Sequence, residues 1–154
     1  MTADAKTLVI GIGNEYRGDD AVGLDVARRL SQSTPGKCEV IQANGAGIDL
    51  IGKWENYDHV IVVDAVRSES APGTIHRIDA VNEELPDAWF HSSTHTVSLP
   101  EAIGLAGTLG LMPTNLTIYG IEGENFEPGV SLSPAVKQAA EHLIARILDE
   151  VATA

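Results

Sequence analysis

The sequence predicts an α/β fold, a three-layer sandwich in which a mostly parallel sheet is flanked by helices on both faces. Short apolar runs of strand length alternate along the chain with segments whose apolar residues recur at helical spacing. The chain has 154 residues, of which 44% are hydrophobic and 21% are charged, which is enough for one domain with its own core. We therefore expect a single domain over residues 1–154, with functional groups at the carboxyl ends of its strands.

The expected elements follow one another in a regular order. The apolar runs predict strands at residues 7–13, 38–43, 59–65, 74–78 and 116–121. Helical spacing predicts helices at residues 20–30, 48–54, 98–109 and from 133 onward. Two of these helices carry start signals, because Ser98, Pro100 and Glu101 form a capping box with proline in the first turn, and Ser133-Pro134 opens the last helix.

The composition argues against several classes of partner. The net charge is −12, from 22 acidic and 10 basic residues, whereas nucleic acids and anionic membranes bind basic surfaces. No apolar run approaches the ~20 residues that cross a bilayer, and residues 1–6 lack the apolar core of a secretory signal. Cys38 is the only cysteine, so no internal disulfide can form. We expect a cytoplasmic protein that binds neither nucleic acid nor membrane.

A glycine-rich loop follows the first expected strand. Gly11, Gly13 and Gly18 give the spacing GxGxxxxG, which is longer than the dinucleotide-binding fingerprint. The loop continues into Asp19 and Asp20, whose carboxylates would repel a pyrophosphate at this helix N-terminus. The sequence therefore disfavours a nucleotide-binding enzyme. The acidic pair has two other interpretations: it compensates the helix dipole, or it contributes to a metal site.

Two further residues can join an aspartate of this loop. Asp64 follows the apolar run 60–63, where a buried carboxylate is costly unless a cation or another partner satisfies it. His95 lies in a polar segment just before the capping box. Taken singly, Asp64 could be a turn residue and His95 a surface residue. Together, Asp20, Asp64 and His95 would suit zinc, nickel, cobalt or iron, with positions left open for a substrate.

The sequence does not support the other common catalytic motifs of hydrolases. His91 and His95 stand four residues apart, but no glutamate lies between them as the zincin motif requires. Cys38 lies in an expected strand, where it packs, and no serine sits in a G-x-S-x-G elbow. Trp89 and Phe90 have two interpretations, an exposed docking patch for a partner protein or a part of the core.

Four segments together resemble the hydrogenase maturation endopeptidases. They are GIGNEYRGDDAVG (11–23), VIVVDAVRSESAPGTIHR (60–77), STHTVSLPEAI (93–103) and IYGIEGENFEPGVSLSPAV (118–136). The resemblance covers nearly the whole chain in the right order. It implies a twisted, five-stranded, mostly parallel sheet of the phosphorylase/hydrolase-like type. It also places the family's three metal-contacting positions at Asp20, Asp64 and His95.

The resemblance also implies an activity. Members of this family remove the C-terminal extension of a nickel-iron hydrogenase large-subunit precursor after nickel insertion, so that precursor is the expected partner. The nickel is supplied by the substrate, and no tightly bound resident cofactor is expected. Either the metal or a carboxylate of Asp20 or Asp64 can activate the attacking water, with His95 holding the metal. The alternative is a non-catalytic nickel-binding maturation chaperone on the same fold.

One loop departs from the family pattern. Many members carry Asp-Gly-Gly-Thr after the second strand, where this chain has Gln42-Ala43-Asn44-Gly45. If this loop contributes to substrate choice, the specificity of this chain differs from that of those members.

Overall fold

The computed structural model describes residues 7–33, 38–44, 49–90 and 97–153. Its centre is a five-stranded sheet with the strand order β2-β1-β3-β5-β4. The strands are β1 (Thr7–Ile12), β2 (Glu39–Ala43), β3 (His59–Val66), β4 (Ile75–Asp79) and β5 (Asn115–Glu122). The edge strand β4 pairs with β5 in antiparallel orientation, and the other neighbours pair in parallel. The predicted mostly parallel sheet is confirmed.

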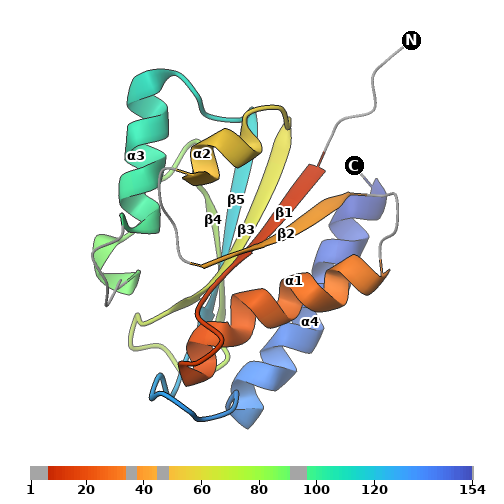
Figure 1. Ribbon diagram of the computed structural model, residues 1–154, viewed down its shortest axis with the longest axis vertical. Helices are drawn as coiled ribbons and strands as arrows, with labels where there is room; N and C mark the ends of the chain where they lie inside the picture. Colours follow the sequence, from red (N-terminus) through yellow and green to blue (C-terminus); the bar gives the residue numbers. More distant parts are fainter. Residues whose placement is uncertain (1–6, 34–37, 45–48, 91–96, 154) are drawn as a thin grey trace.

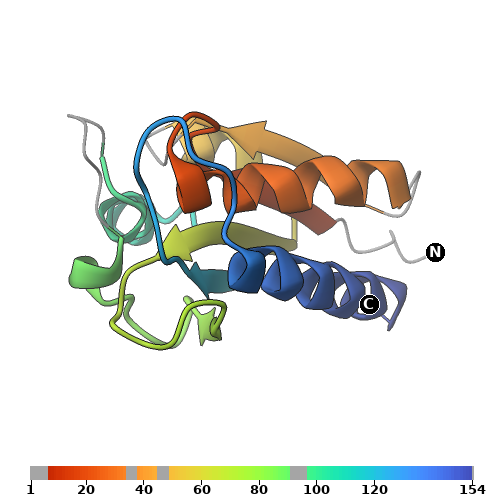
Figure 2. The ribbon, with the colours of Figure 1, turned by 90° about the horizontal axis from the view of Figure 1, so that it is seen from below.

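In the described part of the chain, helices cover both faces of the sheet. They are α1 (Val22–Ser33), α2 (Asp49–Trp54), α3 (Leu99–Leu109) and α4 (Pro134–Thr153), with short 3-10 helices η1 (Gly18–Ala21) and η2 (Asp87–Trp89) in the connections. Figures 1 and 2 show α1 and α4 side by side on one face, with α2 and α3 on the other. The three-layer sandwich is confirmed. Within the described ranges, none of these helices has the length and apolar character of a membrane span.

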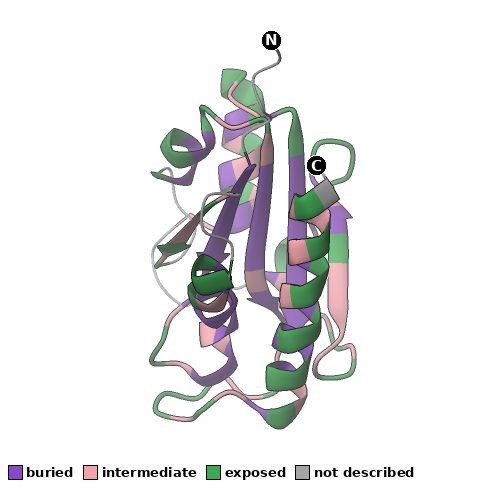
Figure 3. Ribbon diagram, turned by 90° about the vertical axis from the view of Figure 1, so that its right-hand side faces the viewer, coloured by how far each residue is buried: buried purple, intermediate pink, exposed green. Residues whose placement is uncertain are grey.

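The sheet carries an apolar cluster on each face. The strand residues that face α1 and α4 include Val9, Ile61 and Tyr119. Those that face α2 and α3 include Leu8, Val62 and Ile118. Because both faces are covered, β1 and most of β3 are apolar without interruption, and Figure 3 shows the central strands buried.

The first turn of α1 lies in direct contact with the backbone of β1 and β3. A Cβ atom on Gly23 would be 2.1 Å from the carbonyl oxygen of Ile12 and 2.5 Å from that of Val63. A Cβ atom on Gly11 would be 2.0 Å from the carbonyl oxygen of Gly23. Only glycine permits this approach. The contact sets the segment before α1 close to the carboxyl ends of β1 and β3.

The carboxyl ends of β1 and β3 form the topological switch point of the sheet. From β1 the chain passes through α1 to β2 on one side, and then through α2 to β3 on the other side of β1. The two connecting helices lie on opposite faces (Figure 1). In open α/β sheets, a crevice at such a point is the usual place for a binding site.

Most element boundaries differ from those expected by one to three residues, and two of these differences lie close to the predicted site. The helix expected at residues 20–30 begins as the 3-10 turn η1, and α1 starts at Val22. The chain turns sharply here, because Gly18 has a left-handed φ of 55° and packs on the carbonyl oxygen of Asn125. Strand β3 is also longer than expected, because its pairing with β5 continues to Val66. Asp64 therefore lies two residues before the end of the strand.

Candidate active site

Asp20 lies in a hydrogen-bonded turn that follows β1. The N–H of Asn14 donates to the carbonyl oxygen of Asp20 (3.1 Å), and the N–H of Asp20 donates to the carbonyl oxygen of Arg17 (3.0 Å). Gly13 is needed in this turn, because a Cβ atom there would be 2.1 Å from the same Asp20 oxygen. The turn thus holds the half-buried Asp20 at the switch point.

Asp64 reaches the same end of the sheet from β3. It pairs with Gly120 of β5, and it lies on the same face of the strand as Val62 and Val66, the face covered by α2 and α3. Oδ1 of Asp64 accepts a hydrogen bond from the N–H of Ala65 (2.8 Å). Among the described residues, Ala65 is the one donor to this carboxyl. One donor is few for a carboxyl group that protein atoms surround.

The carboxyls of Asp20 and Asp64 are close enough to repel one another. Burial raises the pKa of Asp64 well above its ordinary value of 3.8, and the charge of Asp20 raises it further. Protein atoms surround the Asp64 carboxyl, although the residue keeps some contact with solvent. Burial also raises the pKa of Asp20, while the charges of Arg17 and Arg67 act to lower it. A divalent cation would be stabilised between two such carboxylates.

His95, the third predicted site residue, lies outside the described residues, so its place in the site stays a prediction. The structure brings Asp20 and Asp64 together at the switch point. Within the described ranges, no three His, Cys, Asp or Glu residues form a group that could hold a metal ion. A metal bound by the two aspartates would therefore need a ligand from beyond those ranges or from a substrate.

Trp89 and Phe90 pack on the core, which decides between the two interpretations of this pair. Phe90 is buried, and Trp89 is partly buried against the same cluster under α2 and α3. The indole ring lies against the imidazole of His76, with 4.7 Å between ring centroids. The carbonyl oxygen of Trp89 accepts a hydrogen bond from the N–H of Arg67 (3.0 Å). The segment around Trp89 is thus tied to the chain that follows β3.

Asp19, adjacent to Asp20, has a structural role that the sequence did not indicate. Its buried carboxylate accepts hydrogen bonds from the N–H groups of Glu124 (2.7 Å), Asn125 (2.9 Å) and Ser133 (2.7 Å), and from the Ser133 hydroxyl (2.7 Å). Burial acts to raise the pKa of Asp19, but these bonds outweigh it and lower the pKa. Asp19 therefore ties η1 to the loop between β5 and α4. Its partners are 105 to 114 residues away, so no local signal could have revealed them.

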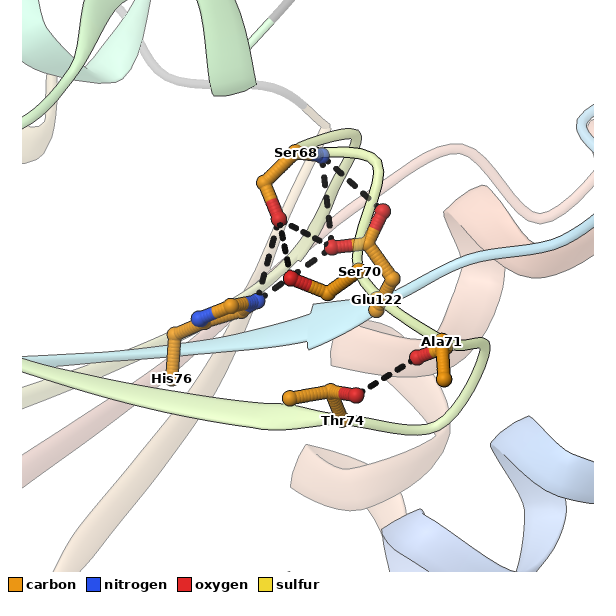
Figure 4. Close-up of polar contacts among 6 residues, drawn as sticks. All are labelled: Ser68, Ser70, Ala71, Thr74, His76 and Glu122. Carbon is orange, nitrogen blue, oxygen red and sulfur yellow. Dashed lines mark hydrogen bonds and ion pairs between the residues drawn. The ribbon is translucent and has the colours of Figure 1, made fainter.

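A second well-bonded carboxylate, Glu122, ends β5 (Figure 4). Its oxygens accept the N–H of Ser68 at 2.9 and 3.2 Å, and one of them also accepts the Ser68 hydroxyl. The same oxygen lies 3.2 Å from Nε2 of His76. Burial acts to raise the pKa of Glu122, but the hydrogen bonds from Ser68 and the contact with His76 lower it overall. We refer to Ser68, Ser70, His76 and Glu122 as the Glu122 cluster.

The Glu122 cluster has the residue types of a Ser-His-Glu triad but not its geometry. The Ser68 hydroxyl and the Glu122 carboxylate both approach Nε2 of His76, each at 3.2 Å. In a catalytic triad the acid binds Nδ1 and the serine binds Nε2, so that the imidazole can relay a proton. The Glu122 cluster therefore fixes the loop after β3 and does not create a serine nucleophile.

A cleft of about 640 Å³ lies between three loops at the carboxyl end of the sheet, and neither Asp20 nor Asp64 is among the residues that line it. Its walls come from the loop before η1, the β3–β4 loop and the β5–α4 loop, and they include Arg17, Arg67, Ser70, Glu122, Asn125 and Phe126. Arg17 and Arg67, which line the cleft, are the residues whose charges act on Asp20, so the cleft lies near Asp20. A cleft of this size can hold several residues of an extended chain.

Comparisons with known proteins identify the family. A sequence model of the hydrogenase maturation proteases matches residues 24–150. The chain belongs to the hydrogenase maturation protease family. The Hydrogenase 2 maturation protease of Escherichia coli (strain K12) is 31% identical over 147 residues, which are 93% of this chain and 88% of that protein.

Solved structures of hydrogenase maturation proteases share the fold. The hydrogenase maturating endopeptidase HybD from E. coli has a TM-score of 0.79 and 30% identity, over 96% of this chain and 93% of that chain. The [NiFe] hydrogenase maturation protease HycI from Thermococcus kodakarensis KOD1 has a TM-score of 0.75 and 25% identity, over 97% and 94%. The predicted family and fold are both confirmed.

In this member of the hydrogenase maturation protease family, the loop that we expect to depart from the family pattern begins inside β2. Gln42 and Ala43 are strand residues and Asn44 follows, while Gly45 lies outside the described residues. The carbonyl oxygen of Ala43 accepts a hydrogen bond from the N–H of Gly13 (3.1 Å). The altered loop thus starts next to the turn that carries Asp20.

Proposed function

We propose that this chain is an endopeptidase that removes the C-terminal extension of a nickel-iron hydrogenase large-subunit precursor after nickel insertion. The observation that carries the proposal is the pair of repelling carboxylates, Asp20 and Asp64, at the switch point of a chain of this family. A cleft near Asp20, large enough for an extended segment, supports a polypeptide substrate.

The nickel of the loaded precursor is the proposed signal for cleavage. Asp20, Asp64 and His95 would offer two oxygen ligands and one nitrogen ligand, a set that accepts nickel but includes no thiolate to hold it firmly. The metal would therefore stay with the substrate. A cation between Asp20 and Asp64 offsets their repulsion, so recognition of the loaded precursor and assembly of the site are the same event.

Hydrolysis also requires a water molecule held near the scissile carbonyl. A carboxylate oxygen of Asp20 or Asp64 can orient this water and accept its proton as the water oxygen attacks. The same carboxyl can then return the proton to the leaving amine as the C–N bond breaks, which releases the tail with the carboxylate regenerated. The substrate's metal supplies the polarisation of the carbonyl.

A comparison of two forms of the precursor tests the proposal. Metal-stripped enzyme receives equal amounts of nickel-free and nickel-loaded precursor, and the mass of each is followed over time. We expect only the loaded precursor to lose its tail. Equal cleavage of both forms would contradict the nickel signal, and zinc rescue of the nickel-free reaction would establish an ordinary zinc peptidase instead.

The same experiment separates a protease from a nickel-binding chaperone. A chaperone would bind the loaded precursor and leave its mass unchanged. The Asp20→Asn variant serves as the matched control, because it keeps the shape of the side chain while removing one of the proposed metal ligands. We expect this variant to leave the loaded precursor uncut.

A further inference from the structure

We propose that Arg67 is a substrate-binding residue whose guanidinium binds a carbonyl or carboxylate oxygen of the precursor chain in the cleft near Asp20. The inference rests on the proposed function, because it takes the precursor as the occupant of the cleft. Arg67 directly follows β3, the strand that carries Asp64, and it lines the cleft. Arg67 lies within the segment 60–77 that resembles the family, but the mechanism above gives it no role.

The backbone of Arg67 is fixed on both sides. Its own N–H donates to the carbonyl oxygen of Trp89 (3.0 Å). The N–H of the next residue, Ser68, donates to the buried carboxylate of Glu122 at 2.9 and 3.2 Å. These bonds join the start of the β3–β4 loop to two separate elements. The Cα atom of Arg67 therefore has a defined place at the edge of the cleft, although the residue is exposed.

The side chain of Arg67 contacts Phe126, which also lines the cleft and belongs to the β5–α4 loop. Its Cζ atom lies 4.0 Å from the centroid of the Phe126 ring. That ring is seated on Gly123, where a Cβ atom would be 2.3 Å from Cζ of Phe126. Asp19 in turn holds the same loop through the N–H groups of Glu124 and Asn125. The guanidinium thus contacts the β5–α4 loop, which the buried carboxylate of Asp19 holds in place.

The contact with Phe126 leaves the hydrogen-bond donors of Arg67 available. A guanidinium carries five N–H donors, and its contact with an aromatic ring uses none of them as a hydrogen bond to an oxygen. Among the described residues, none accepts a hydrogen bond or forms an ion pair with this guanidinium. The group is therefore ordered and charged but has donors left for an oxygen acceptor. Its charge also acts on Asp20, so an acceptor bound here would lie close to Asp20.

The alternative role for Arg67 is structural, a contact with Phe126 alone. An arginine kept only for its contact with Phe126 could be replaced without any effect on the precursor. Arg146 on α4 offers a matched control, because it is also exposed and its Cζ atom lies 5.3 Å from the centroid of the Tyr119 ring. Tyr119 belongs to the cluster under α1 and α4, and Arg146 is not among the residues that line this cleft.

The test measures precursor binding and cleavage separately. We compare wild type with three variants, Arg67→Gln, Arg67→Lys and Arg146→Gln. For each protein the measurements are the Kd for the nickel-loaded precursor, the KM and kcat of its cleavage, and the thermal stability. We expect Arg67→Gln to raise Kd and KM about tenfold, as for the loss of a charge-assisted hydrogen bond, with kcat changed less than about twofold. Arg67→Lys should fall between it and wild type, because lysine keeps the charge but lacks the planar fork. Arg146→Gln should bind and cleave like wild type.

The remaining outcomes would contradict either the role of Arg67 in binding or the protease function. Unchanged Kd and KM for Arg67→Gln would overturn the inference and leave the protease function intact. A fall in kcat alone would also overturn it, since the residue would then act in the transition state and not in binding. If wild type binds the precursor without cutting it, the protease function fails, and the Kd series still decides the role of Arg67.

Changes in the precursor distinguish the two sources of the oxygen acceptor. Acidic residues on either side of the cleavage site are replaced by their amides, and the altered precursor is bound to wild type and to Arg67→Gln. If Arg67 binds a side-chain carboxylate, wild type should lose about tenfold in affinity and Arg67→Gln should lose nothing further. If it binds a main-chain carbonyl, wild type should be unaffected, while Arg67→Gln should remain weaker by the same factor.

Discussion

Four carboxylates near the switch point fall into two pairs with opposite surroundings. Asp19 and Glu122 are buried but well supplied with hydrogen-bond donors, and their pKa values are lowered. Asp20 and Asp64 keep some contact with solvent, have fewer donors, and their pKa values are raised. Position does not explain the difference, because Asp19 and Asp20 are adjacent in sequence and Asp64 and Glu122 lie on paired strands.

The difference separates carboxylates that hold the fold together from the two that we propose act on the substrate. A buried carboxylate that receives several N–H and O–H donors stabilises the folded state, and its removal leaves those donors unsatisfied. A carboxylate that receives few donors and faces a like charge costs stability until a cation or a substrate completes its surroundings. We call Asp19 and Glu122 the structural pair and Asp20 and Asp64 the reactive pair.

The largest effect is expected from Asp64→Asn. Asparagine can keep the acceptor for the N–H of Ala65, but it removes a metal ligand and a proton acceptor, so cleavage should fall by about 10²- to 10⁴-fold. The melting temperature of the metal-free protein should stay the same or rise, because repulsion from Asp20 is lost. Mass analysis of the precursor and thermal melting check the two parts. A melting temperature far below wild type would move Asp64 into the structural pair.

The opposite pattern is expected from Asp19→Asn. One carboxylate oxygen becomes an NH₂ group that faces N–H or O–H donors, so the free energy of unfolding should fall by about 3 kcal/mol. Urea denaturation measures this change. The neighbouring Asp20→Asn is the control, and its free energy of unfolding should differ from wild type by no more than about 0.5 kcal/mol. Equal losses in the two variants would remove the distinction between these adjacent residues.

A smaller, pH-dependent effect is expected from Glu122→Gln. Its pKa in the folded state is below the ordinary value of 4.5, so the ionised group stabilises the fold above pH 4.5 and this contribution is lost as the pH falls through the lowered pKa. The variant should be about 1–2 kcal/mol less stable at neutral pH, and the gap should narrow in acid. Denaturation at a series of pH values gives both quantities.

The titratable side chain that contacts Glu122 is His76 on β4. A His76→Gln variant measured over the same pH series separates the imidazole from the carboxylate. A gap between wild type and Glu122→Gln that stays constant, or widens in acid, would show that ionised Glu122 does not stabilise the fold.

The smallest effect is expected from Ser68→Ala. This change removes the hydroxyl that donates to Glu122 but keeps the backbone N–H that also donates to it, so stability should fall by about 1 kcal/mol. Cleavage should remain within about twofold of wild type. Loss of cleavage without loss of stability would mean that Ser68 acts on the substrate, and the Glu122 cluster would then belong with the reactive pair.

Local patterns were sufficient to predict the layers of the fold. The capping box is an example: the N–H of Glu101 donates to the Ser98 hydroxyl (3.3 Å), and the N–H of Ser98 donates to the Glu101 carboxylate (3.2 Å). All of its parts lie within one turn of α3, so the sequence shows them directly. The strand–helix alternation likewise predicted the parallel sheet, and with it the meeting of Asp20 and Asp64 at one edge.

The rest of the site depends on contacts between distant parts of the chain. Asp19 looked like a partner of Asp20 because the two are adjacent, yet its hydrogen bonds go to the β5–α4 loop. Glu122 binds Ser68 across 54 residues, and Arg67 contacts Phe126 only after both loops are in place. All of these residues lie in the segments that resemble the family, but their partners are distant in sequence, so only the packed structure reveals these contacts.

Asp19 binds residues that are synthesised long after it, which affects the order of folding during synthesis. Its partners at residues 124, 125 and 133 are made after nearly all of the sheet. Contacts so distant in sequence form late, because a long loop must close before they contribute. A growing chain can pair β1 and β3 while the wall that supports Phe126 is still missing. The cleft is therefore completed only when the start of α4 has left the ribosome, long after the segments that carry the reactive pair.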